Sequence, residues 1–147
     1  MSTSSYASAS PATPHERVEM GRLWRVGLLA IVAAAVANAV VWAIANALFD
    51  IPDEFVPLAN VGPAIVITAL FLLVGLAVFA LLVRFTRRPI TWFWRIAVAA
   101  FLLSFVSLLG ASGQDGSTAA GLVTLGVMHV VAFVVFVPLV TGRTRTG

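Results

Sequence analysis

Four long apolar runs constrain this chain more than any other feature of its sequence. They cover residues 26–49, 61–83, 93–109 and 119–140. A helix needs roughly 20 apolar residues to cross the ~30 Å hydrocarbon core of a bilayer, and all four runs approach or exceed that length. Strands of a membrane barrel would be about half as long and would alternate polar with apolar residues, unlike these runs. The sequence therefore predicts an all-α fold, a polytopic membrane protein built as a four-transmembrane-helix bundle.

The composition supports this class of protein. Mean hydropathy is +1.04, and charged residues make up only 10% of the 147 residues. A soluble domain of this size needs a larger polar surface than these residues supply. The absence of cysteine excludes disulfides, a CxxC redox pair and any thiolate metal site. The net charge of +3 comes from arginines whose positions fit a membrane better than a nucleic acid, so we expect no nucleic-acid partner.

The chain divides into one membrane domain and two short tails. Residues 1–16 are rich in Ser, Ala, Thr and Pro, and such a segment buries too little apolar surface to offset the entropy lost on ordering. We expect a disordered tail over 1–16, a four-helix domain over 17–142 and a second tail over 143–147. A cleaved signal peptide ending near the Ala-x-Ala pattern at 43–47 is the alternative, but its apolar region exceeds the usual ~7–15 residues.

Arginine placement predicts the orientation of the helices. With four crossings, both ends of the chain and the connection between the second and third runs share one side. All nine arginines belong to that side: Arg17, Arg22, Arg25, Arg84, Arg87, Arg88, Arg95, Arg143 and Arg145. The two opposite connections hold four acids and no arginine: Asp50, Asp53, Glu54 and Asp115. By the positive-inside rule, both termini are expected in the cytoplasm.

The charged connections raise two binding hypotheses. The connection between the second and third runs carries four candidate contacts for lipid headgroups: Arg84, Arg87, Arg88 and Arg95. Membrane topology alone would also explain these arginines. The acidic segment 50–60 offers carboxylates to a divalent cation but lacks EF-hand spacing, so we expect solvated loop charge in preference to a calcium site. No metal or other cofactor is expected.

Polar side chains within the apolar runs are predicted to form a layer. Counted from the arginine-rich side at ~1.5 Å per residue, Asn38, Ser104 and His129 all lie roughly 16–18 Å deep, near the midplane. Thr68 lies about one turn further along its helix. Unpaired polar groups cost several kcal/mol in lipid, so we expect these four side chains to face the bundle interior. Asn38 with His129 is the first pairing to test.

Small residues repeat along the first run and predict a packing surface. Alanine recurs every four residues, a spacing that suits close contact between helices. The members of this stripe are Ala35, Ala39, Ala43 and Ala47. The residues left over on this helix are expected to face lipid: Leu28, Leu29, Val32, Val36 and Val40.

His129 admits a structural and a functional interpretation. Interhelical hydrogen bonds contribute only about 0.6–2 kcal/mol each, yet they fix which helix faces meet. An ionisable group inside a membrane is also a candidate site for a proton or a ligand. A haem would need a second axial ligand at the same depth, which one chain does not offer. No nucleophile–base pair, P-loop or dinucleotide-binding glycine pattern is present, so no enzymatic activity is expected.

Two stretches resemble an uncharacterised family of small four-helix membrane proteins: "LWRVGLLAIVAAAVANAVVWAIA" (23–45) and "VMHVVAFVVFVPLV" (127–140). The resemblance covers essentially the whole bundle, and its marks are the Leu-Trp-Arg start, Asn38, and His129 ahead of Pro138. It implies four helices in a bacterial inner membrane, mostly in actinobacteria, and no known activity. In size and helix number alone, the chain is also similar to DoxX-type membrane proteins.

Two functions remain open from the sequence. The first is a non-enzymatic accessory or scaffold protein that associates through its helices with a second copy or another membrane protein, surrounded by membrane lipids. The second is a small transporter or proton-linked carrier that uses the layer around His129. A cavity that admits water to His129 would favour the carrier, and a dry, packed midplane would count against it.

Overall fold

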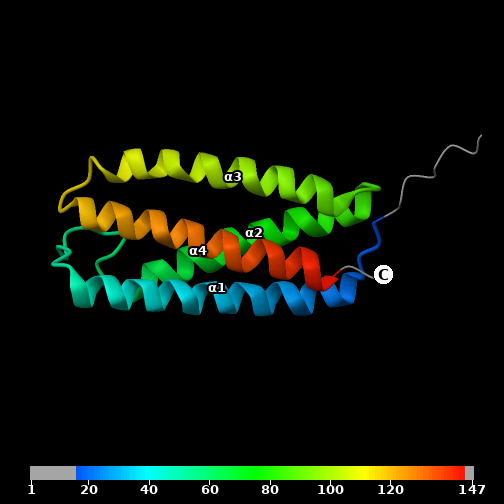
Figure 1. Cartoon of the computed structure of the whole chain (residues 1–147), viewed down its shortest axis with the longest axis horizontal. Coiled ribbons are helices and arrows are strands. Elements are labelled where there is room, and N and C mark those ends of the chain that lie inside the picture. Colours follow the sequence, from blue (N-terminus) through cyan, green and yellow to red (C-terminus); the bar gives the residue numbers. More distant parts are fainter. Residues whose placement is uncertain (1–15, 145–147) are drawn as a thin grey trace, which may run out of the picture.

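The computed structural model describes residues 16–144 and confirms the all-α prediction. Four helices follow one another: α1 (Met20–Leu48), α2 (Val61–Phe85), α3 (Pro89–Ala111) and α4 (Ala119–Thr144). Each helix is long and apolar enough to cross a membrane, and together they make a multi-pass membrane protein. The helices run alternately in opposite directions and lie lengthwise beside one another (Figure 1). The predicted tail residues 1–15 and 145–147 lie outside the described residues.

The helices extend beyond the apolar runs that predicted them. α1 begins at Met20 instead of residue 26, and α4 continues to Thr144 instead of residue 140. α3 begins four residues early with Pro89 in its first turn, where the missing N–H of proline costs no helical hydrogen bond. Hydropathy marks only the part of a helix that crosses hydrocarbon. A helix continues into the headgroup region wherever arginine and tryptophan favour that environment.

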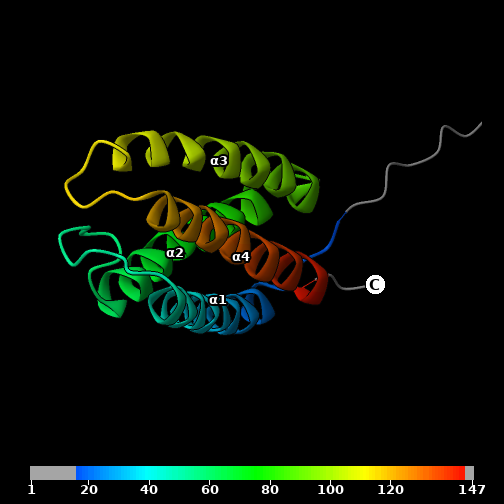
Figure 2. The ribbon, with the colours of Figure 1, turned by 60° about the vertical axis from the view of Figure 1, so that its left-hand side comes forward.

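The four helices form a ring in which each packs against its neighbours along the chain. α1 contacts α2 and α4, and α3 contacts the same two helices. α1 and α3 occupy opposite corners and do not contact each other within the described residues; α3 lies on the far side of α4 from α1 in both ribbon views (Figures 1 and 2). α1 makes the most extensive contacts, whereas α3 buries few of its residues: Pro89, Ile90, Phe93 and Ala111.

An aromatic cluster packs the arginine-rich half of the bundle. The rings of Phe79 and Phe93 stack with centroids 4.5 Å apart, and Phe136 meets Phe93 edge-on at 6.5 Å. Leu23 and Leu76, both fully buried, belong to the same cluster. These five residues come from all four helices, so this cluster holds α3 against the rest of the bundle.

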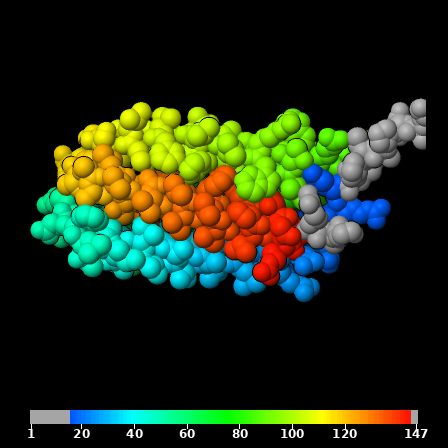
Figure 3. Space-filling view, viewed as in Figure 1, coloured from blue at the N-terminus to red at the C-terminus, as the bar shows by residue number. Residues whose placement is uncertain are grey.

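The connection between α1 and α2 closes the other end of the bundle. Its acidic side chains are exposed, but Phe55 and Leu58 are buried, and the indole Nε1 of Trp42 donates a hydrogen bond to the Leu58 carbonyl oxygen at 2.9 Å. The Phe55 ring lies 3.1 Å from where a Cβ on Gly121 would stand. Figure 3 shows this connection, in teal, against the start of α4, in orange. The predicted solvated loop is therefore also a hydrophobic plug.

Gly116 allows the two connections at this end to approach each other. Its φ of +70° lies in the left-handed region that favours glycine. A Cβ at this position would stand 2.9 Å from the backbone nitrogen of Phe55. The connection 112–118, which contains Gly116, is thus tightly packed against the plug.

Glu16, which the sequence assigned to the disordered tail, binds the beginning of α3. One carboxylate oxygen accepts hydrogen bonds from the backbone N–H groups of Ile90 at 2.7 Å and Thr91 at 3.2 Å, and the other accepts from the Thr91 hydroxyl at 2.7 Å. The first turn of a helix has free N–H groups and a partial positive charge, and an anionic side chain satisfies both. Glu16 therefore ties the chain before α1 to α3, a helix that α1 itself does not touch.

Candidate functional site

The four residues of the predicted polar layer lie at similar depths. Each stands 15 to 18 residues from the arginine-rich end of its helix, which corresponds to roughly 22–27 Å at the rise of an α-helix. Their directions around the helix axes differ, however. Depth alone therefore does not decide which of them meet.

Asn38 pairs with Thr68 and not with His129. The Asn38 side chain is 2% exposed, and its Nδ2 donates a hydrogen bond to the Thr68 hydroxyl at 2.9 Å, which links α1 to α2. The Oδ1 atom of Asn38 is buried and has no hydrogen-bond partner among the described residues. Most buried polar atoms in proteins have a hydrogen-bond partner. The amide oxygen of Asn38 is an exception near the membrane centre, and it could still accept a hydrogen bond.

His129 is partly buried and bonds to its own helix. Its Nδ1 lies 2.7 Å from the Leu125 carbonyl oxygen one turn earlier, and its ring lies 6.2 Å from that of Phe105 on α3. A carbonyl oxygen only accepts, so Nδ1 carries a proton, and in the neutral imidazole Nε2 is then an acceptor. Nε2 has no hydrogen-bond partner in the part of the chain that the structure describes.

Ser104 does not complete the layer. Its hydroxyl donates to the Phe101 carbonyl oxygen of the same helix at 2.6 Å. Ser104 lies on α3, and α3 does not contact α1, so Ser104 cannot meet Asn38. The predicted layer is thus one interhelical pair, Asn38 with Thr68, together with two side chains bonded within their own helices.

The predicted alanine stripe leaves the interior as it runs along α1. Ala35 is buried, Ala39 is half-buried, and Ala43 and Ala47 are exposed. Four residues exceed one helical turn, so a strict four-residue repeat rotates about 40° per step around the helix. The buried residues of α1 instead follow mixed spacings of three and four as far as Asn38, and Ala45 follows two turns later: Leu23, Gly27, Ala30, Ile31, Ala34, Ala35, Asn38 and Ala45. As expected from the sequence, the side chains on the opposite face are exposed: Leu28, Leu29, Val32, Val36 and Val40.

The outward part of the stripe forms the floor of an open groove between α1 and α2. The groove has a volume of about 480 Å³ and exposes almost only apolar surface. It is lined by Ile31, Val32, Ala35, Val36, Ala39, Val40, Ala43, Ile65 and Ala69. The residues of α1 in it centre on residue 37, near the middle of the apolar run 26–49. The groove therefore spans the membrane midplane instead of lying within one leaflet.

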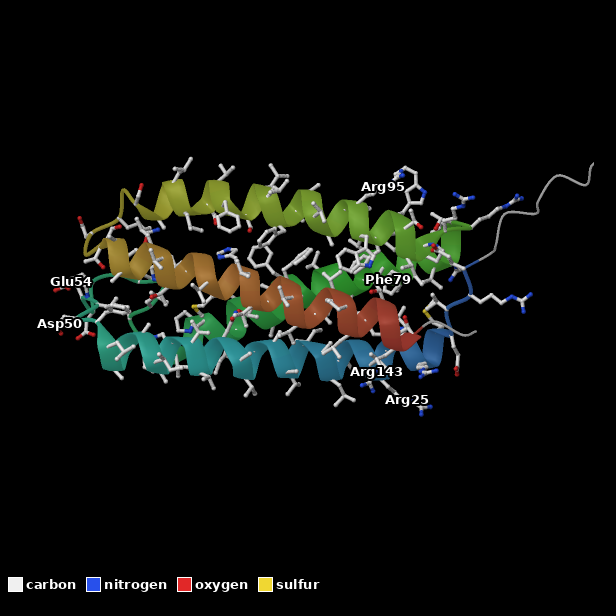
Figure 4. The ribbon with its side chains drawn as sticks, in the orientation of Figure 1. Arg25, Asp50, Glu54, Phe79, Arg95 and Arg143 are labelled. Atoms are coloured by element: carbon white, nitrogen blue, oxygen red, sulfur yellow. The ribbon has the colours of Figure 1, made fainter. Side chains whose placement is uncertain are left out.

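The labelled arginines of Figure 4 lie at one end of the bundle, where Trp24, Trp92 and Trp94 also lie. Arg25, Arg95 and Arg143 all lie at the end opposite Asp50 and Glu54 (Figure 4). The Arg95 guanidinium lies 5.2 Å from the Trp92 ring centre, and that of Arg84 lies 5.9 Å from the Phe85 ring centre. The tryptophans at this end are partly exposed, as expected for side chains at a membrane interface: Trp24, Trp92 and Trp94.

The described residues 16–144 contain no group of three or more His, Asp or Glu side chains that could hold a metal ion. The four acids at the plug end are exposed loop charges. The candidate site consists of a polar pair and an unpaired imidazole nitrogen inside the membrane, with an apolar groove outside.

Comparison with known proteins places the chain in a family. Neither curated proteins nor solved structures gave a match. The model of one family covers residues 18–146, which includes all four helices. This agrees with the resemblance to an uncharacterised family carried by the first and last helices. The chain belongs to the family of unknown function DUF6069.

Proposed function

We propose that the protein is a non-enzymatic accessory or scaffold unit of the bacterial inner membrane that associates with its partner through the outward face of α1. The observation that carries the proposal is the apolar groove at the membrane midplane, floored by Ala35, Ala39 and Ala43. Small side chains let two helix backbones approach closely, and in lipid this packing is a main source of helix association. A groove centred on the midplane suits a crossing helix.

The surface beside the groove indicates what would fill it. Val32, Val36 and Val40 form an exposed ridge at the same four-residue spacing as the alanines. Ridges of such spacing pack into grooves of the same spacing on a partner helix. A second copy of α1 carries both the ridge and the groove. Self-association is therefore the first form to test, and association with another membrane protein is the second.

The arginine-rich end is proposed to face the cytoplasm, with both termini on that side. The positive-inside rule supports this orientation. Because the chain has no cysteine, single cysteines at Thr86 and at Ser112 would report it. In intact cells, a membrane-impermeant maleimide is expected to label Ser112→Cys and to leave Thr86→Cys unlabelled. The reverse pattern would require the opposite orientation.

Filling the groove is expected to weaken association. Ala39→Leu should lower the association constant at least tenfold, because the added side chain separates the two backbones. Energy transfer between labelled copies, diluted stepwise in liposomes, measures the constant. Ala33→Leu is the matched control, since Ala33 is exposed on the same helix outside the groove. Equal association of wild type, Ala39→Leu and Ala33→Leu would contradict the proposal.

A small proton-linked or solute carrier is the second candidate function. The observation that favours it is the pair of unpartnered polar atoms within the membrane, Asn38 Oδ1 and His129 Nε2. On the scaffold proposal, His129→Leu leaves assembly and cell phenotype unchanged. On the carrier hypothesis, proteoliposomes with the wild-type protein show solute or proton flux, and the same substitution abolishes it.

A further inference from the structure

The arginine-rich end carries charge that the described protein does not neutralise. Seven guanidiniums form no ion pair within residues 16–144: Arg22, Arg25, Arg84, Arg87, Arg88, Arg95 and Arg143. Four of these belong to the α2–α3 connection or its flanks, and three belong to α1 and α4. Two of the seven side chains lie over an aromatic ring among the described residues.

Arg84 and Arg95 lie over aromatic rings of their own helices. Arg25 and Arg143 have no such contact among the described residues, and both are exposed. Arg25 lies in the second turn of α1 and Arg143 in the last turn of α4, the helix against which α1 packs most extensively. Figure 4 shows both side chains at the arginine-rich end, on the α1 edge of this view and away from Arg95.

Two guanidiniums at the same end of two packed helices, with no pairing acid among residues 16–144, attract an anion. Phosphate oxygens match the planar, multiple N–H donors of arginine, so one phosphate can engage both side chains. We propose that Arg25 and Arg143 form a binding site for the phosphate of an anionic membrane lipid at the seam between α1 and α4.

The surroundings of the pair favour a lipid over a soluble anion. Trp24 stands next to Arg25 and is partly exposed, as expected at the interface between headgroups and hydrocarbon. One turn deeper, Leu28 and Leu29 are exposed and offer apolar surface to acyl chains. A phosphate held by Arg25 would therefore keep its acyl chains in the hydrocarbon layer. This inference depends on the four membrane-spanning helices and not on the proposed association through α1.

Lipid retention by the purified protein tests the site. The full chain is purified in a mild detergent, and binding of phosphatidylglycerol and phosphatidylcholine is measured by native mass spectrometry. The double variant Arg25→Gln, Arg143→Gln loses both donors to the shared phosphate and is expected to bind phosphatidylglycerol about thirty-fold more weakly. The comparison variant Arg84→Gln, Arg87→Gln loses the same charge from the α2–α3 connection, whose arginines the sequence also offered to headgroups. It is expected to lose affinity by a smaller factor, because it leaves the Arg25 and Arg143 contacts intact.

Each result of this experiment bears on the site. Preference for phosphatidylglycerol in the wild type, lost only in the Arg25 and Arg143 variant, supports it. Equal losses in both double variants would overturn it in favour of a diffuse surface potential, and equal binding of the two lipids would overturn it outright. Inorganic phosphate is added as a competitor. If it displaced phosphatidylglycerol at equal concentration, the site would be for a soluble anion. Circular dichroism establishes that both variants keep the wild-type helix content.

Discussion

Phe55→Ala is expected to lower the free energy of unfolding by about 3–5 kcal/mol, the usual cost of removing a buried phenylalanine side chain. Phe55 is 0% exposed, and its ring packs beside Gly121 at the end of the bundle where the acidic connections meet water. Hydrophobic burial is a driving force at this aqueous end, whereas lipid offers an apolar side chain within the membrane an equally apolar environment. The plug is thus one of the few places where a single apolar side chain contributes this much.

Thermal or denaturant unfolding in detergent micelles, followed by circular dichroism, measures the effect. Val56→Ala is the control, because Val56 is the next residue in the same connection and is 69% exposed. Its effect should stay within about 0.5 kcal/mol, as for most surface substitutions. Equal stabilities of the Phe55→Ala and Val56→Ala variants would mean that the connection does not hold the bundle together.

The sequence predicted the fold because the bilayer imposes it. A span must be apolar for about 20 residues and must satisfy its own backbone hydrogen bonds, so four such runs permit little besides four helices. The predicted ends of the helices were less accurate. Hydropathy falls at Arg25, but α1 already begins at Met20. The chain length, the hydropathy and the distribution of charged residues are therefore enough to predict most of the architecture.

The contacts at the candidate site could not be predicted in the same way. Rise per residue gives the depth of Asn38 and His129, but depth does not tell which neighbour each side chain faces. The directions of the side chains decided that Asn38 meets Thr68 on α2. The ring order of the helices separates Asn38 only from Ser104, which lies on the opposite corner. The sequence offered one clue, since Thr68 belonged to the same polar set.

The burial of Phe55 and the contact of Glu16 with α3 were not predicted, because each depends on a single residue and not on a repeated pattern. Phe55 is a single aromatic residue in an acidic, proline-containing loop, and its burial depends on the space left by α1, α2 and α4 at the end of the bundle. Glu16 follows a Ser- and Pro-rich segment and binds a helix 74 residues later. The alanine stripe is visible in the sequence as a four-residue repeat. Because four residues exceed one helical turn, the stripe rotates around α1, and its later members are exposed.

Gly27→Ala is expected to destabilise the bundle by about 1–3 kcal/mol, the usual cost of overpacking an interior. Gly27 lies on the interior face of α1, where a Cβ would overlap both methyl groups of Leu76 on α2. Leu76 is 0% exposed and lies in the cluster of Phe79, Phe93 and Phe136, so its side chain cannot move aside without disturbing those rings. The backbones of α1 and α2 would have to separate. This effect opposes the usual gain of helix propensity when alanine replaces glycine.

That opposition makes the experiment decisive, because a matched glycine should respond with the opposite sign. Gly142 lies in α4, and nothing stands within 4 Å of where its Cβ would be. Gly142→Ala should therefore leave stability unchanged or raise it by up to about 1 kcal/mol. Unfolding midpoints of both variants in the same detergent measure the difference. A Gly27→Ala variant as stable as Gly142→Ala would show that α1 and α2 are not packed as closely as the structure has them, and the Asn38–Thr68 hydrogen bond between the same two helices would then be in question too.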